Sequence, residues 1–403
     1  MHRLKTNILN KKLIALCLLS FGLVACSSTD DEEEVNAMAE LTEINQQFSP
    51  QVTWSKDVGN GVDDYYSKLT PIVAYDKVFS ASRDGDAVAF DAQTGKQVWQ
   101  IDLRKDNPNG GFMAAKTPAL LSGGPVAGIN RVFIGTENGE LYALSADTGE
   151  VAWTGKVKGE IITKPALDAG VIVVNTASGI LKAFNASNGE EMWKIEQDVP
   201  PLTLRGISAP VIASGGVLTG APNGSLHVTL LENGQRGWSS DIGEATGSTE
   251  LERVIDVDAT PLVYGDKVYA ISARGSLVAL DLRSGRVLWK RQYSSYEDMT
   301  VSGNTIFFTD VKGHVYAIDR LNGLEQWSQL SLTNRKVTGP AVVKDYVVVG
   351  DTEGYLHWLN KETGEFVARK QLDSSGIHSA PTVANDILYV QTRDGELQAV
   401  TTP

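Results

Sequence analysis

The feature that most constrains the fold is a short motif that returns along the chain about every 44 residues. Its clearest copy is Ala89–Trp99, AFDAQTGKQVW, in which a turn glycine is followed by a tryptophan. Other copies, some degenerate, end at Trp153, Trp193, Trp238, Trp289 and Trp327, and a further copy has Ala368 instead. A second glycine precedes each turn glycine, at Gly85, Gly139, Gly179, Gly224, Gly275, Gly313 and Gly354, and an eighth stands at Gly395. About 44 residues is the size of one four-stranded propeller blade, so this spacing predicts eight blades.

Each repeat divides into short runs that favour strands over helices. In the fifth repeat, the runs Lys267–Ile271, Ser276–Leu280 and Arg286–Trp289 are rich in β-branched and apolar residues, and Gly or Asp turns separate them. The Asp-x-x-Ser/Thr-Gly sequence between the last two runs is typical of a tight turn, because Asp caps backbone N–H groups and Gly accepts a positive φ. The sequence therefore predicts an all-β fold.

The two ends of the repeat region complement each other. The last repeat stops after Val400 without an outer strand, whereas Gln51–Trp54 resembles an outer strand with no blade before it. We expect this N-terminal strand to complete the eighth blade and close the ring, which removes open sheet edges. Residues 48–403 are thus predicted to form one eight-bladed β-propeller with four-stranded blades.

The first residues are typical of a secretion signal. Basic residues are followed by the apolar stretch Leu13–Val24, which is too short to be a stable membrane span. The stretch ends in Leu-Val-Ala-Cys, the pattern that a lipoprotein signal peptidase cleaves ahead of a lipidated cysteine. The sequence predicts a signal peptide over residues 1–25 and lipid attachment at Cys26. Ser27 is not the aspartate that retains lipoproteins at the inner membrane, so the outer membrane, on its periplasmic face, is the expected location.

Composition restricts the partners. The formal charge of the chain is −13, and it falls to about −17 once the leader, which has four cations and no acids, is removed; such an acidic surface argues against nucleic acid or anionic headgroups as partners. The only cysteines are Cys17 and Cys26, so the mature propeller has no disulfide. An acidic run follows Cys26, and residues 26–47 are predicted to be a lipidated, flexible tether.

The Ala-x-Asp-x-x-Thr-Gly-x-x-x-Trp repeat resembles that of quinoprotein-type propellers, a likeness specific for fold and much less for function. Joined to the lipobox, the acidic tether and eight blades, it makes the chain similar to the BamB family, lipoproteins of the outer-membrane β-barrel assembly machinery. That resemblance implies a non-catalytic scaffold that binds the periplasmic domains of the central barrel subunit BamA. It also implies that the chain aids the delivery and insertion of outer-membrane proteins, and that it binds these proteins in their unfolded form as clients.

Two motifs match the contact surface of that family. Leu202-Thr203-Leu204-Arg205 matches a Leu-x-Leu-Arg loop, and Asp256-Val257-Asp258 matches an Asp-x-Asp loop. Arg205 and Asp256 each precede the opening proline of a blade by five residues, so adjacent blades should bring the two loops together on one face. The resemblance therefore implies a partner surface at Leu202, Leu204, Arg205, Asp256 and Asp258. The alternative is that the leucines pack on the rim while Arg205 pairs internally with an aspartate.

Two other functions are considered. A quinone-dependent dehydrogenase would share the repeat, but such enzymes stack their quinone on a ring of adjacent cysteines, and residues 48–403 contain no cysteine. A sugar- or peptidoglycan-binding propeller is the other alternative. His227, His314 and His357 fall near equivalent positions of three blades, yet those blades are not all adjacent, so a metal site is not expected. No catalytic residues, cofactor or metal are predicted.

Overall fold

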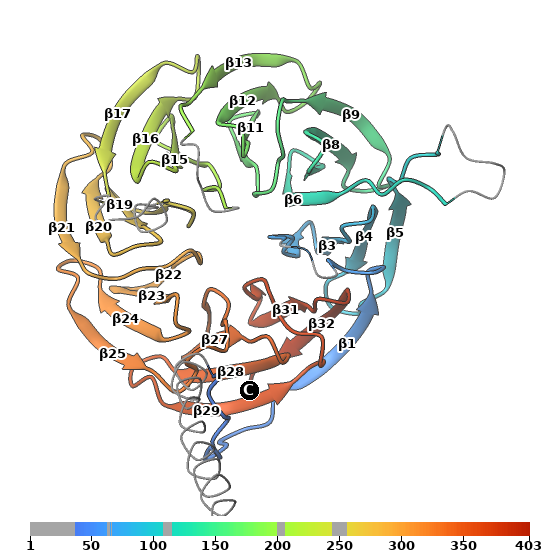
Figure 1. The fold of residues 1–403 in the computed structure, drawn as a ribbon. Coiled ribbons are helices and arrows are strands. Elements are labelled where there is room, and N and C mark those ends of the chain that lie inside the picture. The colour runs from blue at the N-terminus through green and yellow to red at the C-terminus, as the bar shows by residue number, and fades with distance from the viewer. Residues whose placement is uncertain (1–36, 63–64, 66, 108–114, 200–205, 244–255) are drawn as a thin grey trace, which may run out of the picture.

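The computed structural model describes residues 37–403 except 63–64, 66, 108–114, 200–205 and 244–255. Every regular element in these residues is a β-strand. The strands form eight four-stranded sheets, which are arranged as blades around a central axis (Figure 1). The predicted all-β, eight-bladed propeller is confirmed.

The strands follow one another in blade order. Blade one contains β2 (Ile72–Ala74), β3 (Lys77–Ala81), β4 (Asp86–Asp91) and β5 (Gln97–Asp102), and blade two contains β6 (Leu121–Gly128), β7 (Arg131–Thr136), β8 (Glu140–Ser145) and β9 (Val151–Lys156). Blade three contains β10 (Ala166–Asp168), β11 (Val171–Asn175), β12 (Ile180–Asn185) and β13 (Glu191–Glu196), and blade four contains β14 (Val211–Ala213), β15 (Gly216–Gly220), β16 (Ser225–Leu230) and β17 (Arg236–Asp241). Blade five contains β18 (Leu262–Tyr264), β19 (Lys267–Ile271), β20 (Leu277–Asp281) and β21 (Val287–Arg291), and blade six contains β22 (Thr300–Ser302), β23 (Thr305–Thr309), β24 (Val315–Asp319) and β25 (Glu325–Gln329). Blade seven contains β26 (Ala341–Val343), β27 (Tyr346–Gly350), β28 (Tyr355–Asn360) and β29 (Phe366–Gln371), and blade eight contains β30 (Thr382–Ala384), β31 (Ile387–Gln391), β32 (Glu396–Thr401) and β1 (Gln51–Asp57).

The predicted turn chemistry appears between the third and fourth strands of blades one, five and six. In blade one, the Asp91 carboxylate accepts hydrogen bonds from the Thr94 amide at 2.8 Å and from its hydroxyl at 2.7 Å. Gly95 follows with φ of 67°, a conformation that costs a residue with a Cβ roughly 1–2 kcal/mol. The turn glycine is therefore required by the backbone itself.

The tryptophans join neighbouring blades. The Trp99 indole N–H donates to the Ala146 carbonyl of the next blade at 3.0 Å, and a Cβ on Gly149 would lie 2.6 Å from the Trp99 ring. The same donation to the next blade is made by Trp54, Trp153, Trp193, Trp238, Trp289 and Trp327. The motif thus packs the tryptophan ring of one blade against the turn glycine of the next. The hydrophobic clusters also lie between blades.

The ring is closed as predicted. β1 pairs antiparallel with β32, from Gln51 opposite Thr401 to Asp57 opposite Glu396. At the interface between blades seven and eight, Ala368 leaves space that Trp358 fills, and this side chain is fully buried. Its indole N–H donates to the Thr402 hydroxyl at 3.0 Å, so the one tryptophan outside the repeat pattern packs between these two blades.

Two kinds of segment lie on the same face of the ring. One is the connection from the fourth strand of a blade to the first strand of the next blade, and the other is the turn between the second and third strands. Both lie at the same end of an antiparallel blade. In blade four, the Gly224 carbonyl of such a turn accepts the Ile242 amide at 2.8 Å. The Gly85, Gly139, Gly179, Gly354 and Gly395 carbonyls accept in the same way. In these six repeats, the second glycine therefore holds the backbone that follows the fourth strand. We call this side of the ring the connection face.

Residues 37–50 run without regular structure along blade seven before β1 begins. The sequence assigned residues up to 47 to the tether, and the part from residue 37 is hydrogen-bonded to the propeller. Among the described residues, there is no helix with the length and hydropathy needed to cross a bilayer.

Candidate partner-binding site

The two predicted loops are only partly within the described residues. Leu202, Leu204 and Arg205 lie outside them, as does Cys26. Asp256 and Asp258 are described and lie in the connection between β17 and β18, with 1% and 4% of their surfaces exposed. The aspartates therefore sit beneath the connection face rather than on its surface.

The segments that follow the two motifs lie side by side. A Cβ on Gly206 would be 2.5 Å from the Asp258 carboxylate, so the Gly206 backbone lies directly against this side chain. Two residues further on, the Ser208 hydroxyl donates to the Ala259 carbonyl at 3.3 Å. Adjacent blades thus bring these segments together, as their equivalent positions predicted. Whether the five motif residues contact a partner stays a prediction.

Burial determines the charge of this aspartate pair. Loss of water around Asp258, together with the nearby Asp256 carboxylate, raises the pKa of Asp258 to about 7, while Lys68 acts in the opposite direction. Asp258 is therefore poised between its neutral and charged forms near neutral pH. A cation brought next to it would favour the charged form, so the site is suited to respond to an arginine.

A cavity of about 650 Å³ opens at the centre of the ring next to these residues. Its wall includes apolar side chains from blades three and four, among them Leu167 and Ile212, and the ionisable residues Lys68, Lys164, Glu297, Asp298, Lys336 and His378. Burial in the cavity wall removes much of the water around three of these groups. This desolvation lowers the pKa values of Lys164 and His378 and raises the pKa of Glu297.

The acids of the cavity are engaged by the backbone. The Asp298 carboxylate accepts the Thr260 amide at 2.8 Å, and the Glu297 carboxylate accepts the Gly339 amide at 3.3 Å. These contacts tie the opening segments of adjacent blades together. They give the acids a structural role in the wall of the cavity.

The histidines considered for a metal do not converge. His314 Nδ1 lies 2.9 Å from Asp310, and His357 Nε2 lies 3.0 Å from Asp351, each within its own blade. Among the described residues, no group of three or more His, Cys, Asp or Glu side chains is placed to hold a metal ion.

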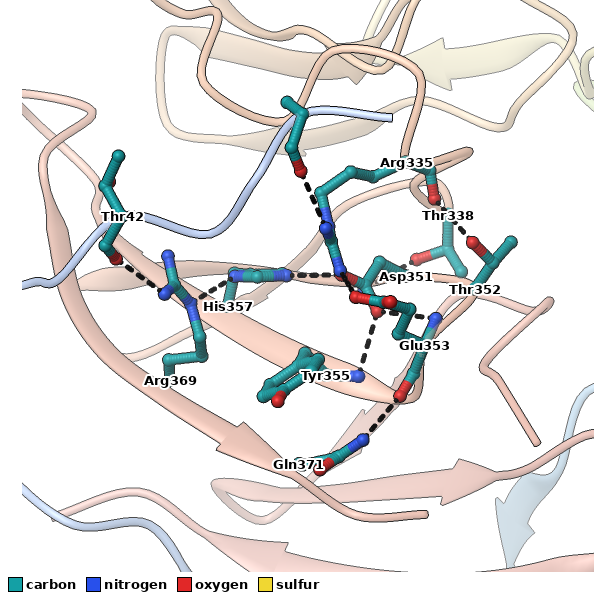
Figure 2. Close-up of polar contacts among 12 residues, drawn as sticks. Thr42, Arg335, Thr338, Asp351, Thr352, Glu353, Tyr355, His357, Arg369 and Gln371 are labelled. Carbon is teal, nitrogen blue, oxygen red and sulfur yellow. Dashed lines mark hydrogen bonds and ion pairs between the residues drawn. The ribbon is translucent and has the colours of Figure 1, made fainter. Parts of the chain in front are cut away.

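Sequence reasoning missed a buried polar network in blade seven (Figure 2). The Arg335 side chain is 1% exposed, and its Nε donates to Asp351 at 2.7 Å. Arg335 also pairs with Glu353, and Arg369 Nε donates to His357 Nδ1 at 3.1 Å. A signal was present, because Arg335 precedes Pro340 by five residues, as Arg205 precedes Pro210.

Comparisons with known proteins cover almost the whole chain. The family described as "Outer membrane protein assembly factor BamB" matches residues 39–121, 83–329 and 312–402. A relative of that name from Shewanella oneidensis is 45% identical over 393 residues, which are 98% of this chain and 99% of the relative. The Escherichia coli relative of the same name is 41% identical over 392 residues, 97% of this chain and 99% of that protein.

Solved structures agree on the fold. The crystal structure of BamB from Moraxella catarrhalis superposes with a TM-score of 0.77 at 25% identity and covers 88% of this chain and 100% of that one. A quinohemoprotein alcohol dehydrogenase from Comamonas testosteroni has a TM-score of 0.67 at 14% identity, covering 87% of this chain and 76% of that one, and shares the fold alone. From its length-wide identity to these relatives and its eight closed blades, the chain belongs to the BamB family of outer-membrane protein assembly factors.

Proposed function

We propose that this chain is a non-catalytic scaffold of the outer-membrane β-barrel assembly machinery that binds the periplasmic domains of the central subunit BamA. The observation that carries the proposal is the near full-length identity to relatives named for outer-membrane protein assembly. The closed ring supports it, because a propeller without free sheet edges offers loops on its faces for recognition. Unfolded outer-membrane proteins are the proposed clients.

The proposed partner surface consists of Leu202, Leu204 and Arg205 together with Asp256 and Asp258. Blade seven offers a comparison, since Arg335 at the equivalent position is paired with Asp351 of its own blade. Blade four has Ala221 where blade seven has Asp351, so that acidic position is not repeated in blade four. The proposed acceptors for Arg205 are therefore Asp256, Asp258 or a group on the partner, and leucines beside an arginine have the composition of a binding hot spot.

The proposed location follows from the leader. Cleavage before Cys26 and acylation of its thiol would hold the propeller on the periplasmic face of the outer membrane. The acidic mature chain would then depend on the acyl chains rather than on its surface charge for attachment.

Co-purification from outer membranes tests the function. The tagged lipoprotein should bring down BamA, and Arg205→Glu should reduce the yield at least about tenfold, because it places a third negative charge beside the buried aspartates and removes a hot-spot side chain. Arg283→Glu is the matched control, since Arg283 is exposed in the turn between β20 and β21 at the opposite face.

Two outcomes would contradict the proposal at different levels. Absence of BamA from the wild-type sample would remove the scaffold function. Normal recovery of BamA with folded Arg205→Glu would leave the scaffold function in place, but it would mean that the partner surface lies elsewhere on the propeller.

A further inference from the structure

The segment before β1 is bound to the propeller by contacts to its backbone. We define residues 37–48 as the strap. Its amides at Ala39 and Gln47 donate to the carbonyls of Thr333 and Val367 at 2.9 and 2.8 Å. Its carbonyls accept from side chains of blade seven and the connection before it: Asn334 to Ala37 at 3.0 Å, Arg335 to Ala39 at 2.8 Å, and Arg369 to Thr42 at 2.9 Å.

Apolar side chains of the strap fix its position. Leu41 packs against the cluster between blades six and seven that contains Phe307 and Trp327. At the other end, the Phe48 ring lies 4.9 Å from the Tyr346 ring and meets the Trp358 ring edge-on at 6.4 Å. Strand-like main-chain pairing with anchors in apolar recesses is a recurring way of binding an extended peptide.

The two arginines that hold the strap are positioned in advance by the network in Figure 2. Arg335 is buried, and two of its N–H groups donate to the carboxylates of Asp351 and Glu353. A further N–H group donates to the Ala39 carbonyl of the strap. A buried guanidinium without such an acceptor would carry a desolvation cost. The strap therefore completes a polar site that the blade leaves incomplete.

His357 orients the second arginine. Its Nδ1 faces Arg369 Nε–H at 3.1 Å and must act as the acceptor, so its Nε2 carries the hydrogen that is donated to Asp351 at 3.0 Å. The ring is thus neutral and held in one tautomer. The charged groups that face it are Asp351, Arg335 and Arg369, with the Tyr355 and Phe366 rings alongside.

We infer that blades six and seven form a peptide-binding seat whose occupant is the strap, and that this seat fixes where the membrane tether leaves the propeller. The strap begins at Ala37, beside Asn334 in the connection between β25 and β26. It therefore leaves from the connection face, where the connection between β17 and β18 that contains Asp256 and Asp258 also lies. The membrane part of this inference rests on the proposed lipid anchor, and residues 27–36 can extend by at most ~35 Å. In this inference the lipid stays within that distance of the connection face.

Cleavage by a glutamate-specific protease at Glu40 and Glu43 tests the seat on the full mature chain, purified in detergent without any partner. Local opening governs such cleavage. Arg369→Gln removes one guanidinium, and Leu41→Asp removes the apolar anchor without altering a blade. Both should speed cleavage at least about tenfold over the wild type. Lys370→Gln, the neighbour of Arg369 on β29, is the matched control and should cleave at the wild-type rate.

Thermal melting followed by tryptophan fluorescence checks that each variant keeps its propeller. Should Arg369→Gln lower the melting temperature, Leu41→Asp alone decides the outcome. Equal cleavage rates for the wild type and Leu41→Asp would overturn the inference. Because the assay contains no BamA and needs no membrane, failure of the proposed function would leave its result unchanged.

The exit point is measured by electron spin resonance between labels at Met38→Cys and Glu362→Cys. Since Cys26 is expected to carry lipid, these would be the free thiols of the mature chain. A single narrow distance distribution in the otherwise wild-type chain, broadened by Leu41→Asp, is the expected result. A broad distribution without Leu41→Asp would mean that the strap does not fix the tether.

Discussion

Replacing Asp258 with asparagine should stabilise the propeller, and more so in alkaline than in acidic solution. Asp258 is 4% exposed, and burial beside Asp256 raises its pKa from 3.8 to about 7. A shift of about three pKa units corresponds to ~4 kcal/mol of preference for the neutral form in the folded state. Asparagine has nearly the same shape and cannot ionise, so it removes this cost.

The sign follows from proton linkage. Between pH 3.8 and about 7, the folded chain binds a proton at Asp258 that the unfolded chain has released, so stability falls as pH rises through this window. At pH 8, ionised Asp258 costs the wild type ~4 kcal/mol, whereas at pH 5 the cost is ~2 kcal/mol. The advantage of Asp258→Asn should therefore grow by ~2–3 kcal/mol between pH 5 and pH 8.

Urea unfolding at pH 5 and pH 8, followed by tryptophan fluorescence, measures both values. Other titrating groups are common to the two proteins and cancel in the difference. Asp345→Asn is the control, because the Asp345 side chain is 89% exposed. An advantage of Asp258→Asn that is the same at both pH values, or a loss of stability at pH 8, would refute the assignment of a buried, destabilising carboxylate.

Four further outcomes follow from the same structure. Gly149→Ala should lower the unfolding free energy by about 2–4 kcal/mol in urea titrations, since φ is 76° and a Cβ would meet the Trp99 ring. Deleting Phe48–Lys56 should cost at least about 3 kcal/mol and produce aggregates in light scattering, because blade eight loses an interblade tryptophan and its cover strand; unchanged melting and monodispersity would argue against closure by β1. Cys26→Ala should abolish incorporation of labelled fatty acid and release the protein from membranes, and label entering the variant would rule out this attachment site. Burial lowers the pKa of His357, so protonation of this ring below about pH 6.5 should lower the free energy of unfolding and speed protease cleavage of the strap. A cleavage rate that does not change between pH 7.5 and pH 5.5 would contradict this expectation.

The propeller could be predicted because its repeat encodes contacts that recur in every blade. A turn such as Asp91–Gly95 needs both its aspartate and its glycine, and the glycine must also receive a tryptophan from the preceding blade. Because the same contacts recur in successive blades, the aspartate, the glycine and the tryptophan recur in the sequence at fixed spacing. The missing outer strand of the last blade was visible for the same reason, since Trp54 stood without a blade of its own.

The strap left no comparable pattern, and its network left only an arginine five residues before Pro340. Its hydrogen bonds use backbone atoms of residues such as Ala39 and Gln47, which any sequence could supply. The burial of Arg335 depends on Asp351, an acceptor that only the folded blade brings within 2.7 Å. Similarly, the motif around Asp256 suggested an exposed loop, because residue types in a connection do not reveal how deeply neighbouring blades cover it.

We propose that this chain assists outer-membrane β-barrel assembly through the loop at Arg205. The most direct measurement is the amount of folded barrel protein in outer membranes, read from its heat-modifiable migration on gels, in cells that lack the chain and carry a plasmid copy. The wild type and Arg283→Glu should restore folded barrels to the normal amount, and Arg205→Glu, although folded and membrane-bound, should not. Full restoration by Arg205→Glu, or normal barrels in cells without the chain, would contradict the account.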